Sequence, residues 1–300
     1  MADERDEFRV GNLPQGLNVS ASNGPPEALR SFSSNLALRQ DVNTFGLAGK
    51  IWHSAYTIQA YFSPDVQRLI TPQQPIPLAY FKDSTVDVSG AKPYRILELG
   101  AGTGYVGIAL ANMLREPCQV YITDLEQVVP LIEENIATHY QPGHAQVFAR
   151  RLHWGNQADA DALLADGPFD LVVISDCVYF PELFDILTDT LLHVCNDTTR
   201  VLIGYKCRSL EKEVGFWQDY FGRFFEYEPV RKLDGYDADD DGTDSTKDDE
   251  EMDLSTGEGG GGMFGEEEQV FIFTGIKRAE KDIKTADDTF ITLMLCSIGI

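Results

Sequence analysis

A glycine-rich turn that follows an apolar strand constrains the fold of this chain more than any other segment. Residues 95–105 read RILELGAGTGY, so a predicted buried strand leads directly into Gly100, Gly102 and Gly104. Glycines at the end of a strand let the backbone turn sharply and approach a ligand closely, and the next helix directs its N-terminal N–H groups at that ligand. The segment therefore predicts a strand, a ligand-binding loop and a helix.

Strands and helices alternate from residue 94 onward, which is typical of right-handed crossovers in a mostly parallel sheet. The predicted strands are short apolar runs, with their exit loops, at residues 94–100, 119–124, 145–155, 169–176, 199–206, 224–230 and 269–278. The last two have no helix between them and are expected to form an antiparallel hairpin at the sheet edge. We therefore predict an α/β fold, with a seven-stranded, mostly parallel twisted sheet and helices on both faces.

The predicted domain covers residues 28–278, and the segments around it differ in composition. Residues 1–27 are rich in Gly, Pro, Asn and Ser and are predicted to be disordered. Within the domain, residues 231–269 carry fifteen acidic and three basic side chains, and we predict a disordered acidic insertion in the last hairpin. Residues 279–300 form a tail whose apolar end, FITLMLCSIGI, is too short to span a bilayer.

Part of the acidic insertion resembles a calcium-binding loop. The run from Asp237 to Gly242, followed by Asp248, matches the liganding positions of an EF-hand. However, Asp244 stands where an apolar residue is expected, Asp248 replaces the usual Glu, and no amphipathic helices flank the run. We interpret it as a solvated acidic loop and predict no metal site.

Composition limits the partners of this chain. A net charge of −24 argues against a protein that grips nucleic-acid phosphates with its own surface. No apolar run approaches the ~20 residues of a membrane helix, and the charged start MADERDEFRV is unlike a signal peptide. The five cysteines lack metal-ligand spacing and indicate a reducing compartment. We expect a cytoplasmic monomer without nucleic-acid or membrane partners.

Two classes of ligand compete for the glycine loop. Gly102, Gly104 and Gly107 satisfy G-x-G-x-x-G, the dinucleotide fingerprint, so glycine spacing alone does not decide. Glu98 comes just before the loop, and its carboxylate suits the ammonium group of a methionine moiety but would repel a pyrophosphate. We therefore predict that the cofactor is S-adenosylmethionine.

Three further residues are candidates for contacts with this cofactor. Asp124 ends the second strand, where an acid in doubly wound folds hydrogen-bonds the ribose of an adenosine; the alternative is a charge ahead of the next helix. Trp154 lies where the third strand exits and could stack on adenine, and Trp52 could close over the amino-acid end. Ordinary core packing is the alternative for both tryptophans.

The fourth strand ends in the sequence Ser175-Asp176-Cys177-Val178-Tyr179. Ligands bind outside the carboxyl ends of strands in open α/β sheets, so Asp176 and Tyr179 are predicted to face the active site. A lysine amine suits methyl transfer, because an aromatic channel desolvates it and lowers its pKa. Tyr179 is the predicted channel wall and Asp176 the positioning acceptor. Cys177 is interpreted as a packing residue, because no histidine accompanies it.

These motifs resemble methyltransferase family 16, the seven-strand, non-SET protein-lysine methyltransferases. The resemblance rests on the stretch ending in Trp52, on ELGAGTG, on the TDL segment with PLIEENI, and on LHWG and DCVYF, and it spans about residues 30–278. It implies a Rossmann-like class I methyltransferase fold. It also implies that S-adenosylmethionine contacts residues of the N-terminal stretch and of the ends of four predicted strands: Trp52, Gly100, Ala101, Gly102, Asp124, Trp154 and Ser175.

Within the family, DCVYF-PELF with GYKCRS and a downstream FW is similar to the fungal enzymes that methylate translation elongation factor 1A. The similarity implies a protein-lysine N-methyltransferase with a large basic partner, for which an acidic enzyme surface is suitable. The alternatives are a methyltransferase of another protein or of a small molecule, and a non-catalytic scaffold that keeps the cofactor pocket. The absence of Asn-Pro-Pro-Tyr after the fourth strand counts against an adenine or glutamine methyltransferase.

Overall fold

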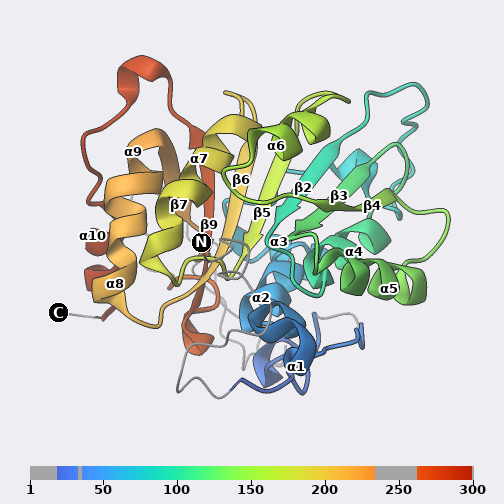
Figure 1. Ribbon diagram of the computed structural model, residues 1–300, viewed down its shortest axis with the longest axis horizontal. Helices are drawn as coiled ribbons and strands as arrows, with labels where there is room; N and C mark the ends of the chain where they lie inside the picture. The colour runs from blue at the N-terminus through green and yellow to red at the C-terminus, as the bar shows by residue number, and fades with distance from the viewer. Residues whose placement is uncertain (1–18, 33–35, 234–261, 299–300) are drawn as a thin grey trace, which may run out of the picture.

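A seven-stranded sheet forms the centre of the computed structural model, which describes residues 19–32, 36–233 and 262–298 (Figure 1). The strand order is β4-β3-β2-β5-β6-β9-β7, and neighbours are parallel except that β9 runs antiparallel to β6 and β7. The strands are β2 (Arg95–Leu99), β3 (Gln119–Asp124), β4 (Gln146–Arg151), β5 (Leu171–Ser175), β6 (Arg200–Lys206), β7 (Phe225–Pro229) and β9 (Val270–Lys277). The predicted fold class is confirmed.

Helices connect the strands and flank the sheet (Figure 1). They are α1 (Val42–Phe45), α2 (His53–Tyr61), α3 (Pro64–Gln67), α4 (Tyr105–Met113), α5 (Val129–His139), α6 (Gln157–Leu164), α7 (Phe184–Val194), α8 (Leu210–Gly215), α9 (Gly222–Phe224) and α10 (Thr289–Ile298). A π-helical turn at Phe216–Phe221 joins α8 to α9, and the short strands β1 (Ile70–Thr71) and β8 (Arg231–Lys232) pair separately from the main sheet.

Alternate residues of the central strands enter hydrophobic cores on opposite faces of the sheet. In β5, Leu171 and Val173 pack with side chains of α2, α4 and α5, whereas Val172 and Ile174 pack with those of α6 and α7. Because both faces are covered, the first four positions of the strand are buried and apolar, and only Ser175 at its carboxyl end is polar. The two cores together fix the carboxyl ends of β2, β3 and β5 at one edge of the sheet.

The last strand of the sheet is inserted between two earlier ones. In β9, Phe273 lies opposite Ile203 of β6, and Gly275 lies opposite Tyr227 of β7. The predicted antiparallel pairing of the last two strands is therefore confirmed. The edge position on this side belongs to β7, and β9 is an interior strand.

The structure describes the segments around the predicted domain only in part. Residues 1–18 and residues 234–261 lie outside the described part, and so does the calcium-like run that begins at Asp237. At the described end of the N-terminal stretch, the hydroxyl groups of Ser22 and Tyr56 lie 3.0 Å apart. This contact attaches the segment to α2.

The C-terminal tail, residues 279–300, packs against the domain through α10. Phe290 is fully buried, and its ring stacks on Trp217 with 4.9 Å between the ring centroids and 9° between the planes. Tyr205 of β6 meets the same phenylalanine edge-on at 5.6 Å, and Met294 is also buried. These side chains belong to the core that α6 and α7 form, so α10 is part of the packed domain.

We expect Phe290→Ala to lower the free energy of unfolding by about 3–5 kcal/mol, because it deletes a fully buried aromatic ring. Thr292→Ala, at an exposed position of the same helix, is the matched control and should change it by less than about 0.5 kcal/mol. Denaturant unfolding followed by circular dichroism measures both values. Similar small changes in the two variants would contradict a stabilising role for α10.

Candidate active site

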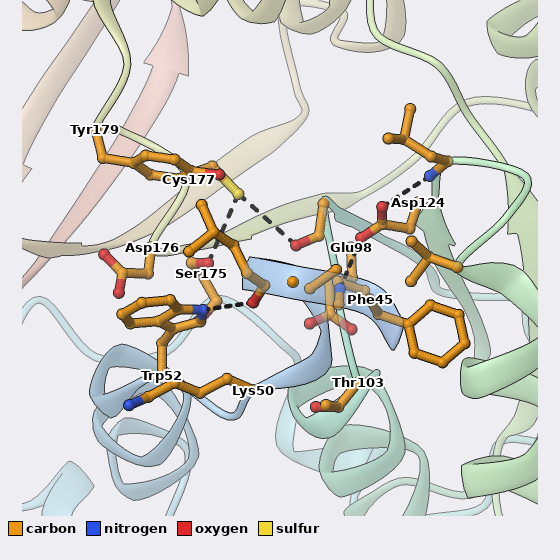
Figure 2. A pocket seen from close by; sticks show the side chains of 18 of the residues that line it. Phe45, Lys50, Trp52, Glu98, Thr103, Asp124, Ser175, Asp176, Cys177 and Tyr179 are labelled. Atoms are coloured by element: carbon orange, nitrogen blue, oxygen red, sulfur yellow. Dashed lines mark hydrogen bonds between the residues drawn. The ribbon is translucent and has the colours of Figure 1, made fainter. Parts of the chain in front are cut away.

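A cavity of about 520 Å³ opens at the carboxyl ends of β2, β3 and β5 (Figure 2). Every residue that the sequence proposes for the site lines this cavity: Trp52, Gly100, Ala101, Gly102, Asp124, Trp154, Ser175, Asp176 and Tyr179. The segment before α2 supplies another wall through Phe45, Leu47 and Ala48, which the sequence did not single out. These three residues are apolar, and their residue types alone suggested no role in a binding site.

The loop after β2 needs its glycines. Gly100 and Gly102 have φ angles of 62° and 56°, in the left-handed region that residues with a Cβ rarely adopt. A Cβ on Gly100 would lie 2.8 Å from the Cys177 sulfur and 2.9 Å from Cζ2 of Trp154. On Gly102 it would lie 2.8 Å from the carbonyl oxygen of Ala48. Cys177, Trp154 and Ala48 therefore pack tightly against the loop, and the loop lines the cavity with its backbone.

Asp124 joins the glycine loop to the neighbouring strand. Its carboxylate accepts hydrogen bonds from the backbone N–H groups of Gly102 at 2.7 Å and of Leu125 at 2.8 Å. Burial raises the pKa of Asp124, and the two hydrogen bonds oppose this rise because they favour the charged form. Each carboxylate oxygen keeps a second lone pair, so the group can still accept a hydrogen bond from a ligand in the cavity.

Glu98 also lines the cavity, at the end of β2. Its side chain is almost fully buried, and it accepts a hydrogen bond of 2.8 Å from the backbone N–H of Gly107 in α4. Burial raises the pKa of Glu98 to about 8, and the nearby charge of Asp124 adds to the rise. In the protein alone this group is therefore mostly uncharged at neutral pH, unlike the carboxylate expected from the sequence.

Two tryptophans lie on the cavity wall. Trp52 is the N-cap residue of α2, and its indole N–H donates to the carbonyl oxygen of Leu47 at 3.0 Å (Figure 2). Trp154 follows β4 and lies against Gly100. Both side chains are half-buried and face the cavity, so each offers an aromatic surface to a ligand.

Asp176 occupies an unusual backbone conformation at the end of β5. It has a φ angle of 62°, and its side chain is 1% exposed. The guanidinium group of Arg208 binds both carboxylate oxygens, Nη1 to Oδ1 at 2.7 Å and Nη2 to Oδ2 at 2.5 Å. Arg208 lies in the GYKCRS motif, but sequence reasoning gave it no role in the site, because a pair 32 residues apart leaves no local pattern.

The other residues at the end of β5 differ in character. The Ser175 hydroxyl lies 3.1 Å from the hydroxyl of Ser54 in α2. Cys177 is buried, and burial raises the pKa of its thiol well above the ordinary value, so it is a poor nucleophile. Tyr179 is half-buried and packs edge-on against Phe180 at 4.5 Å between ring centroids. Burial raises the pKa of Tyr179, so its hydroxyl stays protonated.

Across the described ranges, no group of three or more His, Cys, Asp or Glu side chains is placed to hold a metal ion. Of the helices seen in the structure, none is both long and apolar enough to cross a bilayer. Four cysteines of the described part are free thiols: Cys118, Cys177, Cys195 and Cys207.

Residues 31–220 match the protein family described as lysine methyltransferase. The match covers more than half of the chain and includes the segment before α2, the glycine loop and the end of β5. It therefore contains all of the residues that line the cavity in Figure 2.

Named relatives from a fungus and from vertebrates are similar to this chain. Protein-lysine N-methyltransferase EFM6 of Saccharomyces cerevisiae is 31% identical over 58% of this chain and 69% of its own length. Protein N-lysine methyltransferase METTL21A of Mus musculus is 29% identical over 61% of this chain and 72% of its own. EEF1A lysine methyltransferase 3 of Mus musculus is 34% identical over 51% and 61%, respectively.

The buried Glu98 should make the protein less stable as the pH rises. Its pKa is about 8 in the folded chain against an ordinary value of 4.5, so between these values the folded state holds a proton that the unfolded state releases. Stability from this group is complete below pH 4.5 and is lost as the pH rises through about 8.

Glu98→Gln should remove this part of the pH dependence, whereas Glu133→Gln, at an exposed position of α5, should leave it unchanged. Melting temperatures measured at several pH values between the two pKa values provide the comparison. An identical pH dependence in the wild type and in Glu98→Gln would show that Glu98 is not the titrating group.

Proposed function

This chain belongs to the lysine methyltransferase family, and on that premise we propose that it transfers a methyl group from S-adenosylmethionine to a lysine side chain of a protein. The observation that carries the proposal is the convergence of a glycine loop, two buried carboxyl groups and two tryptophans on one cavity. Glycine spacing alone left a dinucleotide as an alternative ligand. The family match favours the methyl donor.

The cavity has the chemistry that this cofactor requires. Gly100 and Gly102 let the loop pack closely against Cys177, Trp154 and Ala48 while its backbone lines the cavity. A volume of about 520 Å³ lies within the usual range for small-molecule sites. Apolar rings and carboxyl groups together suit a ligand made of a base, a ribose and an amino acid. When bound, S-adenosylmethionine supplies an electrophilic methyl group on a positively charged sulfur.

Each part of the cofactor would meet a different side chain. Asp124 would accept hydrogen bonds from the ribose hydroxyls, and Trp154 would stack on the adenine. Trp52 and Ser175 would border the amino-acid end, where the ammonium group favours the charged form of Glu98. The positions of these side chains around the cavity support this assignment of roles.

The target lysine would enter beside the end of β5. Tyr179 and Phe180 present half-buried rings there, and Trp52 also lines the cavity. Aromatic walls exclude water from the lysine amine, which lowers its pKa and increases the fraction of the nucleophilic form. Asp176 would orient the amine by charge. The hydroxyl of Tyr179 stays protonated and can donate or accept a hydrogen bond.

Translation elongation factor 1A is the substrate that we propose. One relative is named as an EEF1A lysine methyltransferase, and the sequence motifs DCVYF and GYKCRS resemble the fungal enzymes with this substrate. A net charge of −24 favours a basic protein partner, because complementary charge speeds association and orients the encounter. The free thiols of the described cysteines are compatible with a cytoplasmic location.

We expect purified protein to transfer tritium from labelled methyl donor to recombinant elongation factor 1A. Asp124→Ala should weaken cofactor binding by roughly 10–100-fold, because the charged acceptor for the ribose is lost. It should lower methyl transfer at sub-saturating cofactor by a similar factor. Isothermal titration calorimetry measures binding, and filter counting measures transfer.

Glu133→Ala, an exposed acidic residue on α5, is the matched control and should bind and transfer like the wild type. Label found only in the small-molecule fraction of a cell lysate would point to a small-molecule methyltransferase. Cofactor binding without any labelled product would contradict methyl transfer and indicate a scaffold.

A further inference from the structure

The ion pair between Arg208 and Asp176 connects two parts of the site that lie far apart in the sequence. We propose that Arg208 is a positioning residue for methyl transfer: it holds the Asp176 carboxylate in the orientation that the target lysine requires. The inference rests on the proposed function of the site, which assigns the orienting role to Asp176. Three independent features of the structure support it.

The first feature is the geometry of the ion pair. Two parallel hydrogen bonds of 2.7 Å and 2.5 Å join the guanidinium to the two carboxylate oxygens. This bidentate pair fixes both the plane of the carboxylate and its distance from the guanidinium. A lysine in place of Arg208 would make only one such hydrogen bond and would leave the plane free. The Asp176 side chain is 1% exposed, whereas that of Arg208 is 31% exposed. Arg208 therefore covers a carboxylate that would otherwise be buried without a countercharge.

The second feature is the backbone of Asp176. A positive φ angle is uncommon outside glycine, and such conformations persist where the surroundings hold them. The backbone N–H of Asp176 donates to the carbonyl oxygen of Gly204 at 2.8 Å, and Arg208 holds the side chain. Gly204 of β6 thus fixes the backbone of Asp176, and Arg208 in the following loop fixes its side chain. Tyr179 follows three positions later, so the same contacts also place the channel wall.

The third feature is that Arg208 is itself held in place. Its backbone N–H donates to Glu213 at 3.1 Å, and the hydroxyl of Tyr205 donates to the same carboxylate oxygen at 2.5 Å. Glu213 is 2% exposed and lies within α8, so it ties the loop that carries Arg208 to the core. The guanidinium also lies over the ring of Trp52, 5.2 Å from its centroid. One side chain therefore contacts both the residue proposed for the lysine and one proposed for the cofactor.

A double-mutant cycle tests whether Arg208 acts through Asp176. The variants are Arg208→Met, Asp176→Asn and the double variant, and asparagine is chosen because it tolerates a positive φ angle. Arg208→Met should lower kcat/KM for the protein substrate roughly 10–100-fold, mainly through kcat. In the Asp176→Asn background the same substitution should change kcat/KM by no more than about twofold, because the group that it positions is already gone.

Two more variants separate positioning from folding. Arg208→Lys keeps the charge but loses the bidentate pair, and it should recover part of the activity. Arg200→Met removes an exposed arginine at the other end of β6 and should match the wild type. Cofactor dissociation constants should change by less than about fivefold in Arg208→Met, since only the contact with Trp52 is lost on that side. Melting temperatures identify any variant that fails to fold. If Arg208→Met does not fold, Arg208→Lys replaces it in the double-mutant cycle.

The outcomes are distinguishable. Losses that multiply in the double variant would overturn the proposal, because Arg208 and Asp176 would then act independently. Higher activity in Arg208→Met would also overturn it and would mark the ion pair as inhibitory. If the wild type binds the cofactor but methylates no protein, the proposed function fails, and the role of Arg208 fails with it.

Discussion

At the end of β2 the backbone turns through glycines with positive φ angles, a conformation that a neighbouring group must hold. Asp124 supplies that group, because its carboxylate accepts the N–H of Gly102 from the adjacent strand. The contact exists because β2 and β3 are parallel and end at the same edge of the sheet. With the loop fixed, Gly100 packs directly against Cys177 and Trp154, and all three residues line the cavity. The positions of the other lining residues follow from this arrangement.

Much of this site could be predicted from the sequence, because parallel strands bring their carboxyl ends together. A residue that ends a buried apolar run can be placed at this edge of the sheet from the sequence alone. Asp124 and Ser175 are both such residues. Trp154 follows from the exit of β4 by the same argument. The order of the sheet was less accessible, because nothing local shows that β9 lies between β6 and β7. Pairing between strands distant in the sequence depends on the whole core.

The features that the sequence did not predict all depend on contacts between residues far apart in the chain. Arg208 contacts Asp176 only because the fold brings the loop after β6 beside the end of β5. Glu98 was expected to carry a charge, but its almost complete burial raises its pKa to about 8, and burial depends on how α4 packs. No secondary structure was predicted for the apolar end of the tail, which forms α10. Phe290 finds its place against Trp217, which lies more than 70 residues earlier.

The interior position of β9 has a consequence for how the chain is made. Residues 270–277 leave the ribosome after nearly all of the rest, and until then β6 has an unpaired edge and β7 cannot join the sheet. Closing the long connection adds little cost, since loop entropy rises by only about 0.6 kcal/mol for each doubling of length. The unpaired edge of β6 presents a row of free backbone N–H and C=O groups beside apolar side chains, the type of surface that pairs with other chains. During synthesis this nascent chain is therefore expected to need protection by chaperones until its final strand arrives.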